Sequence, residues 1–278
     1  MSVDRALNTS VLFITLDSCR FDTFEREAVP ALRAVGPLHR AIAPSHFTFG
    51  SHAAMFMGFT PGATLDPVPL LNPKFAKLFK LIGPAFGGHG GEGYVLSGAN
   101  IVDGFGNAGF ATYGTGAVRW FDPAIASSRI LTSHFGEFMY AGDYWSSKRQ
   151  VDWMMERVRR HVDEPVFAFL NVGETHTPYW HEGAAWSRDD NPCLPFQQVD
   201  RSQDCAERQA SCLAYLDDVL APLLHMFADS TILVCGDHGD CWGEDGVWEH
   251  GIPHPAALTV PMLMRIRGQA VGVGGVLE

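Results

Sequence analysis

A short apolar run near residue 231 ends abruptly in polar side chains, and this junction most constrains the fold. The run is Thr231–Cys235, and Gly236-Asp237-His238-Gly239 follows it. A strand that stops at such a sequence places the Asp and the His at its carboxyl end, where open α/β sheets bind their ligands. Carboxylate oxygen and imidazole nitrogen are ligands for Zn²⁺ or Mn²⁺. The junction therefore predicts a metal site at the edge of a sheet.

The rest of the chain alternates apolar runs with helical patterns, which predicts an α/β fold with a mainly parallel central sheet and helices on both faces. The 278 residues show no internal repeat or boundary, which favours one domain spanning 1–278. Strands are expected at Val11–Leu16, Tyr94–Ser97, Val166–Val172, Thr231–Cys235 and Val260–Ile266. Helices are expected at Phe24–Val35, Ser51–Met57, Pro73–Ile82, Ser146–Val162 and Cys205–Phe227. The Gly-dense region 83–116 and the polar stretch 180–203 are expected to form loops near the site, the second as a surface excursion or lid.

Charge and cysteine content exclude several classes of partner. The net charge of −11 disfavours nucleic-acid binding and leaves no basic stripe for an anionic membrane. No run approaches the roughly 20 apolar residues of a membrane-spanning helix, and the run at 11–16 is too short for a signal-peptide core. The cysteines lack CxxC spacing and indicate reduced thiols, although Cys193 and Cys205 flank a loop and could pair. We therefore expect a cytoplasmic protein with a small-molecule partner, no nucleic acid and no membrane anchor; the oligomeric state has no signal in the sequence.

Two polar residues near the start of the chain could join the metal site. Asp17 directly follows the first apolar run, where it can reach a metal or cap the next helix. Thr48 precedes a short apolar helix, and the free N–H groups of a helix start bind anions. A Thr hydroxyl is a useful nucleophile only when a metal lowers its pKa. Ser51 is the alternative nucleophile, but we favour it as the N-cap of the helix.

Further polar residues follow strand ends or glycine turns. His176 lies just beyond the run Val166–Val172, at the same edge of the sheet, and a hydrogen bond to backbone is its ordinary alternative role. His250 lies twelve residues after His238, across a Gly-rich acidic loop. Asn100 follows Ser97-Gly98-Ala99 and could reach a bound anion.

Taken in order, these segments form a family pattern. They comprise Asp17 with Arg20-x-Asp22, Thr48-x-x-Ser51-His52, His176-Thr177-Pro178-Tyr179, and Asp237-His238-Gly239 followed by Gly-Glu-x-Gly and His250. This order resembles the alkaline phosphatase superfamily, and most closely its sulfatase-like branch, which includes phosphoglycerol and phosphoethanolamine transferases, phosphonate hydrolases and sulfatases. The resemblance runs from about residue 11 to 265 and implies an alkaline phosphatase-like core. Sulfatase-like chains usually continue past the strand at Val260-Pro261-Met262 with a small second sheet, so we expect this chain to lack most of that C-terminal subdomain.

The resemblance implies a divalent metal, Mn²⁺ or Zn²⁺, held by Asp17, Asp237, His238 and the Thr48 oxygen, with a second metal left open. Thr48 stands where sulfatases carry a Cys, in a Cys-x-Pro-Ser-Arg motif, that is matured to formylglycine, so that chemistry is not expected here. Ser18 stands where many sulfatases have a second metal-binding Asp, which suits Mn²⁺ or Zn²⁺ better than Ca²⁺.

The two remaining histidines are implied to act on the substrate. His250 falls where sulfatases have a Lys that contacts the anion, and a His there can stabilise charge, act as general acid or bind a second metal. His176 is implied to contact the bound phosphate, with Asn100 as a further candidate substrate-binding residue. We therefore expect a metal-dependent hydrolase of a small phosphate monoester, diester or phosphonate, acting through a phospho-Thr48 intermediate. The alternatives are a phosphotransferase or mutase acting on a small cytoplasmic alcohol or sugar, and a non-catalytic metal- or anion-binding member.

Overall fold

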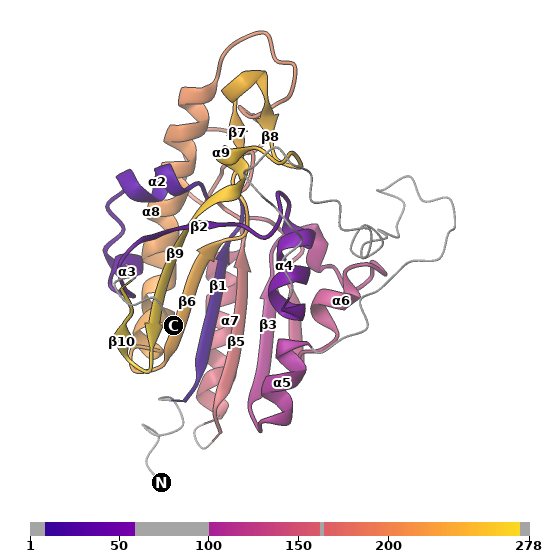
Figure 1. Ribbon diagram of the computed structural model, residues 1–278, viewed down its shortest axis with the longest axis vertical. Helices are drawn as coiled ribbons and strands as arrows, with labels where there is room; N and C mark the ends of the chain where they lie inside the picture. The colour runs from indigo at the N-terminus through magenta and orange to yellow at the C-terminus, as the bar shows by residue number, and fades with distance from the viewer. Residues whose placement is uncertain (1–8, 59–99, 162–163, 273–278) are drawn as a thin grey trace.

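Eight strands form one central sheet in the part of the chain that the computed structural model describes, residues 9–58, 100–161 and 164–272 (Figure 1). The strands are β1 Val11–Leu16, β2 His39–Ile42, β3 Ala111–Gly116, β4 Glu137–Tyr140, β5 Val166–Val172, β6 Thr231–Gly236, β9 Thr259–Ile266 and β10 Gln269–Ala270. Their order is β10-β9-β6-β1-β5-β3-β4, with β2 also pairing with β9. Strands β6, β1, β5, β3 and β4 run parallel, and β9 is antiparallel to β6, β2 and β10. The predicted mainly parallel α/β sheet is confirmed.

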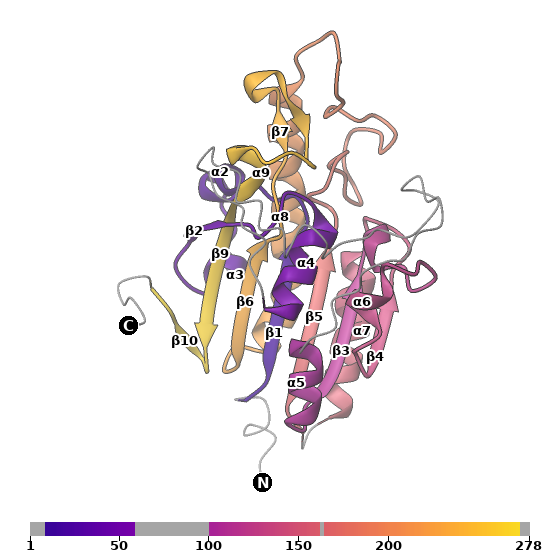
Figure 2. The ribbon, with the colours of Figure 1, turned by 45° about the vertical axis from the view of Figure 1, so that its right-hand side comes forward.

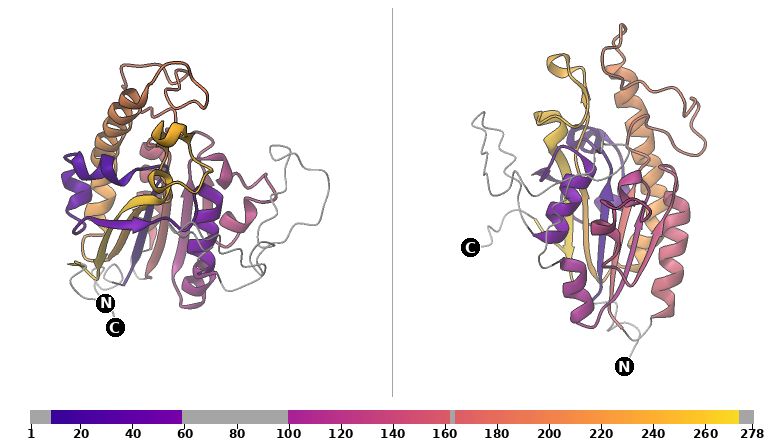
Figure 3. Two further views of the ribbon diagram at one scale, coloured as in Figure 1. Left: turned by 45° about the horizontal axis from the view of Figure 1, so that its top comes forward. Right: turned by 90° about the vertical axis from the view of Figure 1, so that its right-hand side faces the viewer.

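Helices cover both faces of this sheet (Figures 2 and 3). They are α2 Phe21–Arg26, α3 Pro30–Arg33, α4 Thr48–Met57, α5 Ile101–Asn107, α6 Arg129–Thr132, α7 Ser147–Arg160, α8 Ser202–Met226 and α9 Pro255–Leu258. Helices α3, α7 and α8 pack on one face, and α4, α5 and α6 pack on the other. A separate hairpin, β7 Cys241–Trp242 and β8 Trp248–Glu249, stands above the carboxyl ends of the parallel strands.

The central strands are apolar on both faces because each face supports its own core. In β5, Ala168 and Leu170 pack towards α7 and α8, whereas Phe167 and Phe169 pack towards α4 and α5. Such a strand appears in sequence as a continuous apolar run rather than an alternating one. This is why β1 and β5 begin and end at the predicted residues. Each fully buried Phe or Leu stabilises the fold by about 1.5–3 kcal/mol relative to an exposed one.

Helices α7 and α8 lie within three residues of their predicted bounds at each end, and the other two predicted helices in the described ranges also differ. The expected helix Phe24–Val35 is two short helices, because Pro30 lacks the N–H that a continuous helix needs and instead occupies the first turn of α3. Helix α4 begins at Thr48, three residues before the predicted start, so Ser51 lies inside the helix and the prediction that it is the N-cap is wrong.

The described part of the Gly-dense region is not a loop. Residues 100–116 contain α5 and the strand β3, which lies between β5 and β4 in the sheet. Glycine in β3 makes room for aromatic rings: a Cβ on Gly116 would lie 2.3 Å from the ring of Phe121, and one on Gly114 would lie 2.6 Å from Phe138. Glycines that are usually a loop signal here allow close packing. The predicted strand 94–97 and helix 73–82 lie outside the described residues.

Residues 180–201 form turns without regular structure, as predicted for a surface excursion. All six cysteines are free thiols, so Cys193 and Cys205 are not paired. Within the described ranges, we find no helix with both the length and the apolar character needed to span a bilayer.

Candidate active site

Four predicted metal-site residues converge at the carboxyl edge of the sheet. Parallel strands β1 and β6 pair Leu16 with Gly236, so the next residues, Asp17 and Asp237, emerge side by side. His238 follows Asp237, and Thr48 is the first residue of α4, whose start lies at the same edge (Figure 1). All four side chains are buried, with relative exposures of 0 to 1%.

The side-chain atoms of this cluster surround a common centre. His238 Nε2 lies 3.2 Å from Thr48 Oγ1 and 3.6 Å from both Asp17 Oδ1 and Asp237 Oδ2. Thr48 Oγ1 also lies 3.5 Å from Asp17 Oδ2. Asp17, Asp237 and His238 are close enough together to hold one ion. Asp237 Oδ2 is buried and has no hydrogen-bond partner among the described residues. An unpartnered buried carboxylate oxygen is costly unless a cation binds it. The donor set of carboxylate and hydroxyl oxygens with one imidazole nitrogen fits Zn²⁺ or Mn²⁺.

The electrostatics of the cluster favour a bound cation. Burial raises the pKa of Asp237 well above its ordinary value, and the charge of Asp17 raises it further. Burial, together with the charge of His250, lowers the pKa of His238 to about 3. His238 is therefore a neutral imidazole at pH 7. Its Nδ1 lies 3.0 Å from the Gly239 carbonyl, which leaves the lone pair of Nε2 for the cluster.

Neighbouring groups fix both carboxylates. Asn171 of β5 donates from Nδ2 to Asp17 Oδ2 at 3.0 Å, and Thr175 donates to the Asp17 carbonyl at 2.7 Å. The backbone N–H of Ser18 donates to Asp237 Oδ1 at 3.1 Å. Ser18 has a φ of 59°, an uncommon conformation for a residue with a side chain, and such conformations cluster at functional sites.

The start of α4 presents both the Thr48 hydroxyl and backbone N–H groups. Its N-cap residue, Phe47, makes no side-chain cap hydrogen bond. The first turn of a helix favours negative charge, so an anion is favoured beside Thr48. Ser51, the alternative nucleophile, is fully buried, with its hydroxyl 2.6 Å from the Asp237 carbonyl and accepting from Ser45 N–H at 3.1 Å. Ser51 therefore ties α4 to the loop after β6.

His52 supports Thr48 from one helical turn below. Its Nδ1 lies 2.7 Å from the Thr48 carbonyl, and its Nε2 lies 2.9 Å from Thr15 Oγ1. Burial lowers the pKa of His52 to about 4, and its ring packs edge-on against Phe121 and Phe169. The sequence motif places His52 at helical spacing from Thr48, which is the one signal for this role.

His250 and His176 extend the cluster outward. The His250 ring centroid lies 4.4 Å from that of His238 and 5.1 Å from that of His176. His176 also has the ordinary loop role, because its Nδ1 lies 2.7 Å from the Thr177 carbonyl. His238, Asp240 and His250 form a second group with the spacing of metal ligands, so a second metal stays a prediction.

Asp240 is a site residue that the sequence motifs did not predict. Its Oδ1 lies 2.7 Å from His250 Nδ1. Burial acts to raise the pKa of Asp240, but the charge and hydrogen bond of His250 outweigh it and lower the pKa to about 2. Burial acts to lower the pKa of His250, and Asp240 outweighs it so that this pKa is raised. The signal was an Asp two residues after a metal-binding His.

Asn100 is the N-cap of α5, where its Oδ1 accepts from Val102 N–H at 2.8 Å. Its Nδ2 is buried and has no hydrogen-bond partner among the described residues. No hydrogen bond that we describe joins Asn100 to the cluster, and its role as an anion ligand stays a prediction.

Solved structures of the alkaline phosphatase superfamily share this fold. The C-terminal periplasmic domain of phosphoethanolamine transferase EptC from Campylobacter jejuni matches with a TM-score of 0.63 and 11% identity, covering 92% of this chain and 78% of that one. The corresponding EptC domain from Escherichia coli, in complex with Zn, matches with a TM-score of 0.64 and 12% identity, covering 94% and 73%. The putative sulfatase yidJ from Bacteroides fragilis matches with a TM-score of 0.62 and 13% identity, covering 95% and 69%. The alkaline phosphatase-like core is confirmed.

Sequence comparison leads to the same branch of that superfamily. A search of curated proteins finds no match. The family model described as Sulfatase matches residues 91–272, more than half of the 278 residues. That range includes His176, Asp237, His238 and His250, and it excludes Thr48. The predicted likeness to the sulfatase-like branch is therefore confirmed, and the chain belongs to the sulfatase family.

Proposed function

We propose that the protein is a metal-dependent hydrolase of small phosphate esters, in which Thr48 Oγ1 attacks phosphorus and forms a phospho-Thr48 intermediate. One observation carries this proposal: the Thr48 hydroxyl lies within 3.5 Å of both Asp17 Oδ2 and His238 Nε2, at the first residue of α4. A hydroxyl in this position is both a metal ligand and a neighbour of an anion site.

Asp17, Asp237, His238 and the Thr48 oxygen would hold the ion, which we propose is Mn²⁺ or Zn²⁺. When bound, the ion lowers the pKa of the Thr48 hydroxyl and offsets charge on a nonbridging phosphate oxygen. Asn171 and the N–H of Ser18 would keep the carboxylates oriented, because each donates a hydrogen bond to one carboxylate oxygen.

The remaining polar groups would bind the phosphoryl oxygens. The first-turn N–H groups of α4 favour negative charge beside Thr48. His176 and His250 would stabilise the equatorial oxygens as Thr48 attacks in line with the leaving alcohol. Water then cleaves the Thr48–phosphorus bond. A Thr in place of the sulfatase Cys supports phosphorus over sulfate esters, because formylglycine cannot form from it.

Transfer to an alcohol is the second candidate, because two of the similar structures are phosphoethanolamine transferase domains. In that case an acceptor alcohol, instead of water, would take the group from Thr48. A non-catalytic binder is less favoured, because a binding protein needs no hydroxyl nucleophile among its ligands.

The test uses metal-free protein reloaded with Mn²⁺, Zn²⁺, Mg²⁺ or Ca²⁺, and p-nitrophenyl esters of phosphate, phenylphosphonate and sulfate together with the bis-ester of phosphate. Thr48→Val removes the hydroxyl at nearly constant volume, and Thr48→Ser is its matched control that keeps the hydroxyl. We expect Mn²⁺- or Zn²⁺-dependent turnover of a phosphorus ester that falls by at least about 1,000-fold in Thr48→Val and is largely kept in Thr48→Ser. Full activity of Thr48→Val on any ester would overturn the nucleophile assignment.

Hydrolysis and transfer are separated in the same assay. With p-nitrophenyl phosphate as the substrate and glycerol or ethanolamine added as acceptor, a hydrolase releases equal amounts of p-nitrophenol and inorganic phosphate. A transferase releases p-nitrophenol in excess of phosphate. Tight metal binding without turnover of any ester, with or without acceptor, would favour the non-catalytic alternative.

A further inference from the structure

The β7–β8 hairpin brings Asp240 and His250 face to face. The antiparallel strands pair Cys241 with Glu249, so the flanking residues Asp240 and His250 meet at the open side of the hairpin. Their side chains are joined by the 2.7 Å contact between Asp240 Oδ1 and His250 Nδ1. With Nδ1 engaged in this contact, Nε2 is the His250 nitrogen left for the site.

A chain of buried hydrogen bonds holds the other oxygen of Asp240. Asp240 Oδ2 accepts from Tyr179 OH at 2.7 Å, and the Tyr179 oxygen accepts from Trp242 Nε1 at 2.8 Å. An indole nitrogen can only donate, so the Tyr179 proton is directed at Asp240. Asp240 and Tyr179 are both 0% exposed. Asp240 therefore offers His250 only an acceptor, which requires a proton on His250 Nδ1.

We infer that Asp240 is a positioning residue that fixes the proton of His250 on Nδ1 and turns Nε2 to the phosphate ester, with Tyr179 and Trp242 setting the direction of the chain. The claim that His250 Nε2 contacts the phosphate ester rests on the proposed function. The location of the proton rests only on the hydrogen bonds of the four side chains. A neighbouring carboxylate commonly sets a catalytic imidazole in this way, and an amide in its place yields the wrong tautomer.

The hydrogen-bond chain makes a specific prediction for Asp240→Asn. An Asn side chain has one acceptor oxygen and one NH₂ donor. The Tyr179 hydroxyl donates to Asp240 Oδ2 in the wild type, and one lone pair of its oxygen is taken by Trp242. We expect this hydroxyl to keep donating in the variant, so the Asn oxygen turns to it. The NH₂ group then faces His250 Nδ1, which must lose its proton to accept. Removing the Tyr179 hydroxyl in Asp240→Asn/Tyr179→Phe frees the Asn oxygen for His250 and restores the proton on Nδ1.

The measurement is a long-range ¹H–¹⁵N correlation spectrum of the full chain labelled with ¹⁵N-histidine and loaded with Zn²⁺. His250→Gln identifies the His250 signals by their loss, and His176, whose Nδ1 faces the Thr177 carbonyl, is the internal control. We expect Nδ1 of His250 to be protonated in the wild type, unprotonated in Asp240→Asn and protonated again in the double variant. A protonated Nδ1 in Asp240→Asn, or an unprotonated one in the wild type, would overturn the inference.

Turnover of p-nitrophenyl phosphate gives the functional consequence. We expect Asp240→Asn to lower kcat by about 100-fold with a smaller change in KM, and the second change Tyr179→Phe to recover part of that loss. In the His250→Gln background, Asp240→Asn should have no further effect, because a positioning residue acts only through its partner. Equal losses in both backgrounds would contradict the positioning role. If the wild type itself is inactive, the proposed function fails, and the proton on Nδ1 still decides this inference.

Discussion

Glu174 lies two residues before His176 and supports a helix instead of the site. Its Oε1 accepts from Ser147 N–H at 2.9 Å, at the first residue of α7. Its Oε2 is buried and has no partner among the described residues. Burial raises the pKa of this carboxyl from 4.5 to about 7. The side chain is therefore a source of pH-dependent stability that is separate from the metal cluster.

We expect Glu174→Gln to gain stability relative to the wild type as the pH rises. Between pH 4.5 and 7 the unfolded chain loses the Glu174 proton while the native chain keeps it. The contribution of the protonated group to stability is thus full below pH 4.5 and lost as the pH rises through 7, by at most about 3 kcal/mol. Gln keeps the bond to Ser147 and does not ionise.

Urea unfolding of both proteins at pH 4 and pH 8 measures this effect. The free energy of unfolding of Glu174→Gln minus that of the wild type should be larger at pH 8. Glu182→Gln is the matched control, because the Glu182 side chain is 71% exposed and its change should be similar at both pH values. A difference for Glu174→Gln that is the same at both pH values would contradict the buried, protonated carboxyl.

A helix or strand could be predicted from the sequence where its residues fit only one structural role. Strand β5 is apolar on both faces, so its run could only be central. Strand β3 was missed because Gly114 and Gly116, which leave space for phenylalanine rings, have the appearance of loop residues. The hairpin that joins Asp240 to His250 was missed because its strands have two residues each, too few for a periodic signal. The order of the ligands along the chain could be predicted, and the contacts that orient them could not.

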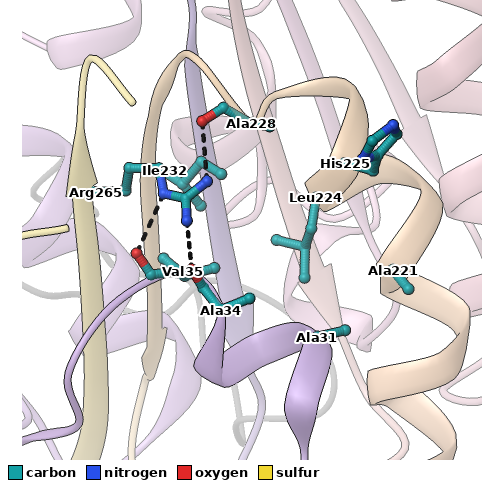
Figure 4. Close-up of a pocket in the computed structure, with 9 residues that line it drawn as sticks. All are labelled: Ala31, Ala34, Val35, Ala221, Leu224, His225, Ala228, Ile232 and Arg265. Carbon is teal, nitrogen blue, oxygen red and sulfur yellow. Dashed lines mark hydrogen bonds between the residues drawn. The ribbon is translucent and has the colours of Figure 1, made fainter. Parts of the chain in front are cut away.

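The guanidinium of Arg265 links the carboxyl ends of α3 and α8 to the antiparallel strand β9. The Arg265 side chain donates to the Ala228 carbonyl, just after α8, at 2.9 Å, and to the carbonyls of Ala34 and Val35, just after α3 (Figure 4). Arg265 also lines a cavity of about 210 Å³, and none of the predicted site residues is among the residues that line it. The last carbonyls of a helix lack partners within the helix and favour a positive charge.

We expect Arg265→Met to lower the free energy of unfolding by about 1.5–3 kcal/mol, the usual contribution of hydrogen bonds to a charged group. The apolar stem is kept, so the loss reports the guanidinium. Arg267→Met is the control, because Arg267 is exposed and its only hydrogen bond that we describe comes from its backbone N–H. Chemical unfolding at pH 7 measures both variants. Equal effects of the two changes would show that Arg265 does not hold the helix ends.

The stability of the whole molecule is linked to the metal cluster because its carboxylates come from β1 and β6, neighbouring strands at the centre of the sheet. In the metal-free protein Asp237 is buried beside Asp17, and burial raises the pKa of Asp237 well above its ordinary value. A raised native pKa gives a contribution to stability that is present in acid and lost as the pH rises. The metal-free fold should therefore weaken from pH 5 to pH 8.

Thermal unfolding with and without Zn²⁺ or Mn²⁺ tests this linkage. A metal that binds only the native chain stabilises it by about 4 kcal/mol at 1,000 times its Kd. The increase in Tm on loading should be larger at pH 8 than at pH 5, because protons compete for the ligands at the lower pH.

Asp237→Asn keeps the acceptor oxygen that receives Ser18 N–H and removes the charge. We expect it to melt above the metal-free wild type at pH 8 and to lose most of the increase on loading. Asp218→Asn, on the exposed face of α8, should change neither value. An Asp237→Asn protein that melts below the metal-free wild type would show that the paired carboxylates do not destabilise the fold, because removal of one charge would then have relieved nothing.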